Sequence, residues 1–356
     1  MGESELPTAS DALHSVPVVD IGALMDASWA DDSGPSEALT SVVHQIAAAA
    51  EEWGFFYIAN HGVTEDDLTR FQQNMRAFFR LPKELKKTIS RHATNSRGYF
   101  DHELTKNKVD WKEGLDFGGR QEDGPAQSSG IRRMGDDENQ WLGENELPGF
   151  RAAMRDYFDR MEHISQRLIM AFSLALGKPP TYLDKYFTTT DSTGTSLRAN
   201  SSFLRLNYYP VSPEPEKSMG VHHHTDAGAV TVLLQDDDVA SLQVLHRATQ
   251  EWHLIPPRPG TFVINIGDML QVWSNDRFIA PLHRVLANGR SERFSAPFFY
   301  NPSYDAVIEP VPTVAADGDP TRAKYEPFGW FDFRLKRFQG DYADHGEEVQ
   351  IAHYHL

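Results

Sequence analysis

Hydrophobic residues recur with a helical period in the first half of the chain and with a strand-like period in the second half. Apolar positions three and four residues apart predict helices at about 37–53, 64–79 and 150–176. Short, compact apolar runs at 16–22 and 55–58 predict one strand before and one strand after the first of these helices. The first half is therefore expected to be mainly helical, with two early strands.

From about residue 197 the pattern changes to short alternating or β-branched runs separated by Pro, Gly, Asn and Asp, which is typical of strands. These runs lie at Phe203–Tyr208, Ala229–Leu234, Leu242–Leu245, Thr261–Ile266 and Arg293–Tyr300. A closing helix is expected at about 330–338. The Gly- and Ser-rich polar stretch at about 118–143 predicts a long surface loop.

Helices followed by many short strands favour an α+β fold that is mainly β. The expected core is a double-stranded β-helix, or jelly roll, buttressed by the N-terminal and central helices. The boundaries that we expect are 1–196 for a helical and mixed region packing on the barrel, 197–305 for the jelly-roll core, and 306–356 for a tail with the closing helix. The sequence contains no G-x-G-x-x-G, P-loop or G-x-S-x-G motif that would favour a parallel α/β fold.

Composition narrows the possible chemistry. The 356 residues include no cysteine, so a metal must be held by His, Asp or Glu and no disulfide can form. The net charge of −17 makes nucleic acid and anionic membrane surfaces poor partners. The chain has no apolar run of membrane-spanning length, so we expect a cytoplasmic protein. Nothing in it resembles a coiled coil or a large exposed apolar helix, so a monomer is expected by default.

The strongest chemical signal is a His-x-Asp pair, His224 and Asp226, followed downstream by His283. On an extended segment His224 and Asp226 point to the same face, and a histidine from a neighbouring antiparallel strand can complete a triangle of metal ligands. Two imidazoles and one carboxylate on one side of an octahedral ion leave three open positions, as iron(II) oxygenases require. Ordinary packing of these side chains in a β core is the alternative. His222 also lies on the face of His224, so a second ligand register exists.

A second constellation follows on a predicted strand, where Arg293 and Ser295 share a face. A guanidinium beside a hydroxyl suits a charge-assisted grip on a distant carboxylate. Phe299 continues the same parity and should face a cavity near the metal, unless it is ordinary barrel core. Arg205 lies on a neighbouring strand, and we hypothesise that it meets an acidic or polar substrate group, with an internal salt bridge as the alternative.

Together these motifs resemble the 2-oxoglutarate/iron(II) dioxygenase superfamily, in the isopenicillin N synthase-like branch that includes anthocyanidin synthase and gibberellin oxidases. The resemblance spans almost the whole chain, in the order Val-Pro-Val-Val-Asp at 16–20, Trp53-Gly54-Phe55-Phe56, Asn60-His61-Gly62, Phe79-Arg80-Leu81-Pro82, Asn207-Tyr208-Tyr209-Pro210, His224-Thr225-Asp226, Leu242-Gln243-Val244, Asn265-Ile266-Gly267-Asp268, His283-Arg284-Val285 and Arg293-Phe294-Ser295. Single motifs are weak, but their order and spacing are specific.

The resemblance implies that His224, Asp226 and His283 bind iron(II), and that Arg293 with Ser295 holds the distal carboxylate of 2-oxoglutarate. It further implies that Tyr209, and less directly Asn207, contacts this carboxylate, and that Tyr99 lines the entrance to the site. The implied activity is that of a dioxygenase, an oxidoreductase that consumes 2-oxoglutarate and dioxygen, releases succinate and carbon dioxide, and hydroxylates, desaturates or cyclises a small-molecule metabolite.

Other functions fit some of the same residues. An iron oxidase of the same fold that does not consume 2-oxoglutarate could keep the Arg293 and Ser295 pair for another acid. A zinc hydrolase could use the same three ligands with a metal-bound hydroxide, although no general-base motif accompanies them. A catalytically silent binding protein would be expected to have lost a ligand, and the intact triad argues against it.

Overall fold

The computed structural model describes residues 16–28, 34–106, 108–123, 137–190, 196–236, 238–313, 321–342 and 348–356. Its helices are α2 (Gly22–Met25), α3 (Glu37–Glu52), α4 (Glu65–Phe79), α5 (Lys83–Lys87), α6 (Phe150–Ala175), α7 (Asp268–Trp273) and α8 (Trp330–Tyr342), with 3-10 turns η1 (Arg120–Asp123), η2 (Tyr182–Tyr186) and η3 (Ile351–Tyr354). Its strands are β1 (Val18–Asp20), β2 (Phe55–Ala59), β3 (Gly98–Phe100), β4 (Leu104–Thr105), β5 (Lys108–Val109), β6 (Glu113–Gly118), β7 (Thr188–Thr190), β8 (Ser196–Arg198), β9 (Phe203–Tyr209), β10 (Met219–His224), β11 (Val230–Gln235), β12 (Leu242–Leu245), β13 (Trp252–Leu254), β14 (Phe262–Ile266), β15 (His283–Leu286), β16 (Arg293–Tyr300), β17 (Val307–Ile308) and β18 (Phe328–Gly329).

Two sheets form the centre of the molecule. The larger has eight strands in the order β1-β2-β14-β11-β16-β9-β6-β3, and the smaller has four in the order β10-β15-β12-β13. Except for the parallel pair β1 and β2, the strands of both sheets are antiparallel. Apolar side chains of both sheets, such as Leu233 and Val263 from the larger and Val244 and Val285 from the smaller, form one buried cluster between them. This is the predicted jelly-roll core, and strands from the first half of the chain extend its larger sheet.

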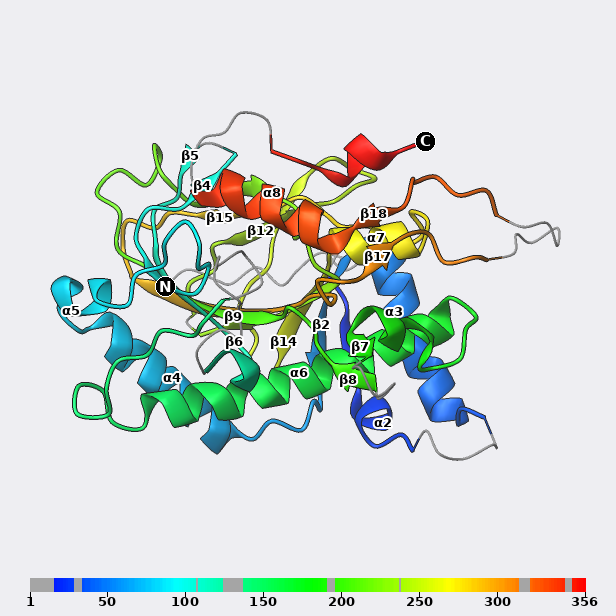
Figure 1. Ribbon diagram of the computed structural model, residues 1–356, viewed down its shortest axis with the longest axis horizontal. Coiled ribbons are helices and arrows are strands. Elements are labelled where there is room, and N and C mark those ends of the chain that lie inside the picture. Colours follow the sequence, from blue (N-terminus) through cyan, green and yellow to red (C-terminus); the bar gives the residue numbers. More distant parts are fainter. Residues whose placement is uncertain are drawn as a thin grey trace, which may run out of the picture.

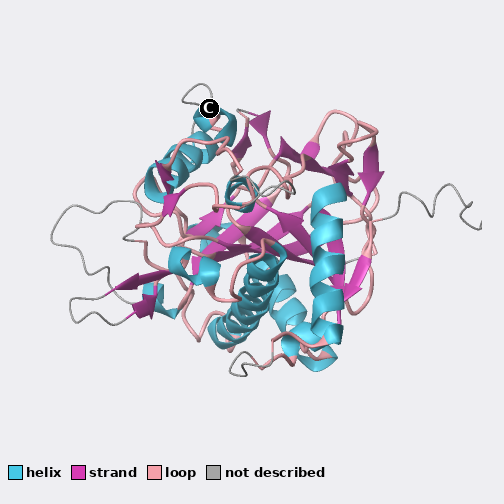
Figure 2. Cartoon of the chain, turned by 90° about the vertical axis from the view of Figure 1, so that its right-hand side faces the viewer, coloured by secondary structure: helices cyan, strands magenta, loops and turns pink. Residues whose placement is uncertain are grey.

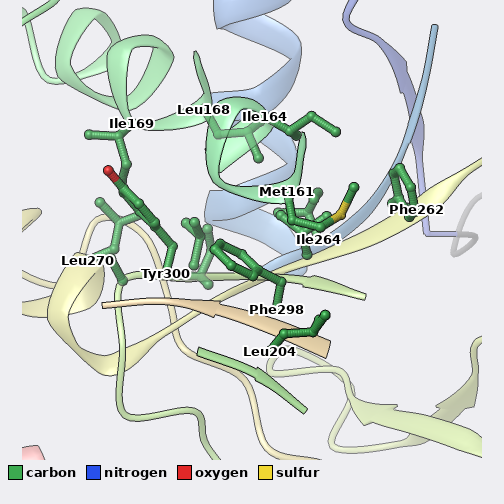
Figure 3. Close-up of a cluster of buried hydrophobic side chains, with 14 of the residues drawn as sticks. Met161, Ile164, Leu168, Ile169, Leu204, Phe262, Ile264, Leu270, Phe298 and Tyr300 are labelled. Carbon is green, nitrogen blue, oxygen red and sulfur yellow. The ribbon is translucent and has the colours of Figure 1, made fainter. Parts of the chain in front are cut away.

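Helices cover the outer face of the larger sheet. In Figure 1, α4 and α6 lie on one side of β9 and β6, while β12, β15 and α8 lie on the other. The quarter turn of Figure 2 shows strands crossing the middle of the molecule with helices around them. Figure 3 shows side chains of α6, including Met161, Ile164 and Leu168, meeting Ile264 and Phe298 of the sheet in the main apolar core.

Strict alternation along the central strands divides their side chains between this core and the barrel interior. On β9, Leu204 and Leu206 are fully buried towards the helices, whereas Arg205 and Asn207 line a cavity on the other side. The same division holds on β16, β11 and β14. A period of two therefore places polar and apolar residues of one strand on opposite faces.

Capping residues set the ends of the N-terminal helices. Ser36 Oγ accepts from the backbone N–H of Leu39 at 3.2 Å, and Thr64 Oγ1 accepts from that of Asp67 at 3.2 Å. Gly54 follows α3 at a φ of 64°, a left-handed conformation that ends the helix and turns the chain into β2. Both helices begin and end close to the predicted positions.

Other predictions compare as follows. The closing helix is present as α8, and it extends beyond the predicted 330–338. Helix α7 and the strands β3 to β6 were not predicted, and β3, β4 and β5, with two or three residues each, are too short to show a period. Residues 124–136 of the predicted loop at 118–143 lie outside the described residues. None of the described helices combines the length and the apolar character of a membrane span.

Candidate metal centre

Three side chains converge at the end of the smaller sheet. Strands β10 and β15 pair antiparallel with His224 opposite His283, and Asp226 follows β10 by two residues. Asp226 Oδ1 lies 3.5 Å from His224 Nε2 and 3.6 Å from His283 Nε2. The three potential ligand atoms all lie within 4.8 Å of one another, and within the described residues this is the one such group of His, Asp or Glu side chains. The donor set, two imidazoles and a carboxylate, suits a divalent iron ion.

Backbone carbonyls orient both imidazoles. His224 Nδ1 lies 2.8 Å from the carbonyl of His222, and His283 Nδ1 lies 3.2 Å from the carbonyl of Pro281. Because a carbonyl only accepts, each Nδ1 must carry a proton, and Nε2 is the nitrogen directed at the centre and able to bind a metal.

Two polar side chains hold the carboxylate. Asp226 Oδ2 accepts from Thr231 Oγ1 at 2.5 Å and from Asn265 Nδ2 at 2.8 Å. These donors come from β11 and β14 of the larger sheet, at the cavity-facing parity. With Oδ2 occupied, Oδ1 is the oxygen left for a metal.

Burial and mutual charge set the protonation of the group. Burial alone would raise the pKa of the Asp226 carboxyl, but the neighbouring imidazoles and the Thr231 hydroxyl lower it well below its usual range. Burial and the proximity of His224 lower the pKa of His283 to about 4. Burial alone would lower the pKa of His224, but its hydrogen bond to Asp226 and the charge of that carboxylate outweigh burial, so the pKa of His224 is raised. A carboxylate and a neutral His283 are thus ready to bind a cation, which would displace the proton from His224.

The structure distinguishes His224 from His222. The side chain of His222 turns to Asp110, whose Oδ1 lies 3.0 Å from Nδ1 and also accepts from the His222 backbone N–H at 3.1 Å. His222 therefore stands outside the group of three, and its backbone carbonyl orients His224 instead.

A second polar cluster lies on the adjacent strands β16 and β9. Register places Arg293 opposite Tyr209 and Ser295 opposite Asn207. The guanidinium carbon of Arg293 stands 5.0 Å from the centroid of the Tyr209 ring, Asn207 Nδ2 lies 3.4 Å from Ser295 Oγ, and Arg293 Nη2 donates to Gln235 Oε1 at 3.0 Å. Arg293 and Ser295 are both buried.

One cavity joins both clusters. Its lining includes the three potential metal ligands, and Asn207, Tyr209, Arg293 and Ser295. Apolar side chains from both sheets and a wall of aromatic rings complete it, among them Phe55, Val221, Leu233, Leu242, Val285, Phe203 and Phe299. This arrangement can hold a metal and a small dianion together.

Arg205 lines this cavity, but acids surround its guanidinium. Nε and Nη2 bind the two oxygens of Asp116 at 2.7 and 2.8 Å, and Nη1 binds Glu103 Oε2 at 2.9 Å. The internal salt bridge, the alternative to a substrate contact, is thus present.

The structure does not bring Tyr99 to the cavity. Tyr99 is fully buried, and its hydroxyl donates to Glu113 Oε2 at 2.8 Å beneath Lys86. The prediction that it lines the entrance is wrong, because β3 pairs with β6 at the edge of the larger sheet and turns this ring into the helical core.

Sequence reasoning missed the residues that orient the site. Thr231 and Asn265 donate to Asp226, and Gln235 accepts from Arg293. All three have the parity of the cavity face, so alternation along the strands could have indicated them. Nothing local in the sequence connects Asp110 with His222.

Two imidazoles and a carboxylate inside a jelly-roll barrel, beside a buried arginine, define a non-haem metal oxygenase. The family model described as 2OG-Fe(II) oxygenase superfamily matches residues 200–302, and one described as non-haem dioxygenase in morphine synthesis N-terminal matches residues 16–144.

Individual relatives agree. Gibberellin 20 oxidase 2 of Oryza sativa subsp. japonica is 35% identical over 332 residues, which cover 93% of this chain and 77% of the relative. 1-Aminocyclopropane-1-carboxylate oxidase of Dictyostelium discoideum is 31% identical over 360 residues, covering 94% and 93%.

Among solved structures, JOX2 in complex with 2OG, Fe and JA matches with a TM-score of 0.69 at 28% identity, covering 90% of this chain and 84% of that one. The dioxygenase for auxin oxidation in rice matches with a TM-score of 0.67 at 23% identity, covering 96% and 100%, and this likeness supports the fold alone. The chain belongs to the 2OG-Fe(II) oxygenase superfamily. It is an oxidoreductase that uses iron(II), 2-oxoglutarate and dioxygen to oxidise a small molecule.

Proposed function

We propose that His224, Asp226 and His283 bind the iron, and that Arg293 and Ser295 bind the distal carboxylate of 2-oxoglutarate with help from Tyr209 and Asn207. The observation that carries this proposal is the opening of both clusters into one cavity. The hydrogen bonds that turn both Nε2 atoms and one carboxylate oxygen towards a common centre support the ligand set.

When bound, iron(II) with 2-oxoglutarate and dioxygen would supply the chemistry: dioxygen oxidises 2-oxoglutarate to succinate and carbon dioxide with one of its oxygen atoms, and the other oxidises the substrate. The protein side chains orient the participants. Arg293 and Ser295 hold one end of the 2-oxo acid, so that its other end meets the open side of the metal ligands. Val221, Leu242 and Val285 exclude water around them.

On the substrate side, we propose that Phe299 forms a wall together with Phe203, whose ring stacks on it at a centroid distance of 4.7 Å. Such a wall suits an apolar part of a small metabolite, and hydroxylation is the expected outcome. Arg205 shapes this wall through its bonds to Asp116 and Glu103. Cytoplasmic location and a monomeric state stay predictions of the sequence, as do the three segment boundaries.

The direct test is anaerobic titration of the metal-free protein with iron(II) and then 2-oxoglutarate, following the weak visible charge-transfer band of a chelated 2-oxo acid. Wild type should form the band. His224→Ala should abolish it, while His223→Ala, which removes an exposed neighbour, should keep it. Arg293→Leu should weaken 2-oxoglutarate binding by about two orders of magnitude, as expected for a lost buried charge-assisted pair, whereas the exposed Arg290→Leu should leave it unchanged.

Two outcomes contradict the proposal. A band that survives His224→Ala but disappears in His222→Ala would assign the other ligand register. A normal affinity for 2-oxoglutarate in Arg293→Leu would place the cosubstrate carboxylate elsewhere. Arg205→Met tests the role of Arg205. Normal substrate affinity together with reduced stability would support its role in shaping the cavity wall. Loss of substrate binding with unchanged stability would instead support a direct contact between Arg205 and the substrate.

A further inference from the structure

The segment that carries the candidate ligands His224 and Asp226 leaves the smaller sheet between these two residues. The last pair of the β10 and β15 ladder is His224 with His283, so Thr225 and Asp226 lie beyond the regular hydrogen bonds. The position of the Asp226 carboxylate therefore depends on its own bonds to Thr231 and Asn265 and on the contacts that hold this short stretch of backbone. Each of its two backbone carbonyls accepts one hydrogen bond: the Asp268 backbone N–H donates to the Asp226 carbonyl at 2.7 Å, and Arg337 Nη2 donates to the Thr225 carbonyl at 2.9 Å.

Arg337 comes from α8, 112 residues away from Thr225 along the chain. All three of its guanidinium nitrogens have partners. Nε pairs with Glu348 Oε1 at 3.0 Å, while Nη1 donates to the Val349 carbonyl at 3.1 Å and to Gln350 Oε1 at 2.9 Å. One buried guanidinium thus joins the ligand-bearing segment, α8 and the C-terminal segment (residues 348–356).

The planar fork of an arginine suits this role because it can donate in three fixed directions at once, which an ammonium on a flexible stem cannot do. Neighbouring groups hold the fork itself in place. Trp330, Phe333 and Phe338 anchor α8 by burial, and Tyr354 of the C-terminal segment stacks on Phe328 at 4.2 Å. The ion pair with Glu348 offsets the cost of burying the charge.

We propose that Arg337 is a positioning residue of the metal centre, which fixes the Thr225 carbonyl and thereby makes α8 and the C-terminal segment part of the iron site. This inference rests on the proposed assignment of Asp226 as an iron ligand. Arg337 also lines the cavity, so the competing role is a direct substrate contact. The two roles differ before any substrate is present, because only a positioning residue alters iron binding by the protein alone.

The experiment compares Arg337→Met and Arg337→Lys with Lys336→Met, which removes an exposed cation at the next position of the same helix. Iron(II) affinity is measured anaerobically without cosubstrate, then the 2-oxoglutarate band at saturating iron, and separately the unfolding of each metal-free protein in urea. We expect Arg337→Met to bind iron(II) about 10- to 100-fold more weakly, the usual effect of removing a group that orients a ligand. Arg337→Lys should recover part of this loss, and Lys336→Met should match wild type.

Unchanged iron affinity and an unchanged band in a folded Arg337→Met protein would overturn the proposal and favour the substrate role. If Arg337→Met does not fold, Glu348→Gln tests the same fork from its other side and should weaken iron binding several-fold; unchanged affinity there overturns the proposal as well. A uniform loss of metal-free stability with normal iron affinity also contradicts it. Failure of the proposed function would look different, since wild type itself would then form no band.

Discussion

The two faces of the larger sheet are built from the same strands and differ in every respect that matters for function. The face towards α6 is apolar and closely packed, with Leu204, Ile264 and Phe298 fully buried. The face towards the smaller sheet carries Asn207, Thr231 and Ser295, whose polar atoms bind one another or a candidate ligand. Neighbouring residues of one strand therefore stabilise the fold on one face and form the candidate site on the other. Substitutions one position apart should change either the free energy of unfolding or the binding properties of the site.

The largest effect should come from a pair of phenylalanines on β16. Phe298 packs edge-on against Phe158 in the helix-facing core, and Phe298→Ala should lower the free energy of unfolding by about 3–5 kcal/mol through the cavity it leaves. Phe299→Ala should cost clearly less, since its ring already faces a cavity. Urea unfolding of the metal-free proteins measures both. Equal losses in the free energy of unfolding would show that side chains on the cavity face stabilise the fold as much as those in the helix-facing core.

A sharper comparison exchanges one hydroxyl between neighbours on β11. Thr231→Val removes a donor to Asp226 at nearly constant shape, so iron(II) affinity should fall by roughly 10- to 100-fold. Val232→Thr places a hydroxyl in the apolar core instead, and should cost about 1–3 kcal/mol of stability with iron affinity kept. Anaerobic iron titration and urea unfolding on both proteins test the exchange. Normal iron affinity in Thr231→Val would mean that Asn265 alone holds the carboxylate.

Asp110 should have a smaller effect, since its hydrogen bonds reach His222 and not the candidate ligand His224. Asp110→Asn keeps an oxygen for the His222 backbone N–H but loses the charge, and iron affinity should fall by less than about tenfold. The same titration measures it, with wild type and His223→Ala as references. Complete loss of iron binding would require a more direct role for Asp110.

The smallest effect concerns pH on the helix-facing side. Burial lowers the pKa of His61, whose Nδ1 accepts from the Val63 backbone N–H and whose ring lies 4.3 Å from that of Phe262. Below the ordinary histidine pKa of about 6.5 the unfolded chain binds a proton that the folded chain resists, so stability should decline as pH falls through that range. His61→Gln should flatten this decline in urea unfolding at several pH values. An unchanged slope would assign the decline to other groups.

Several elements and ligands could be predicted because their signals are local. The helical period, the capping Thr64 and the alternation of β9 and β16 are each contained in one short stretch, and so is the spacing of His224 and Asp226. The parity of Arg293, Ser295 and Phe299 likewise placed all three correctly in the cavity. Tyr99 was misplaced because a three-residue strand carries too little pattern to decide which face it presents.

The sequence by itself determined the strands β1, β2, β9, β11, β12, β14 and β16, the cavity-facing side chains of β9 and β16, and a set of residues able to bind a divalent metal, since hydrophobic periodicity and donor chemistry act over a few residues. The motif His224-Thr225-Asp226 already favoured His224 over His222, but only the tertiary structure showed where His222 turns instead, because its partner Asp110 lies 112 residues away in the chain. The tertiary structure likewise brought Thr231, Asn265 and Arg337 around one short segment of backbone. These contacts follow from how sheets and helices pack, and residues so far apart in the chain carry no local signal of meeting.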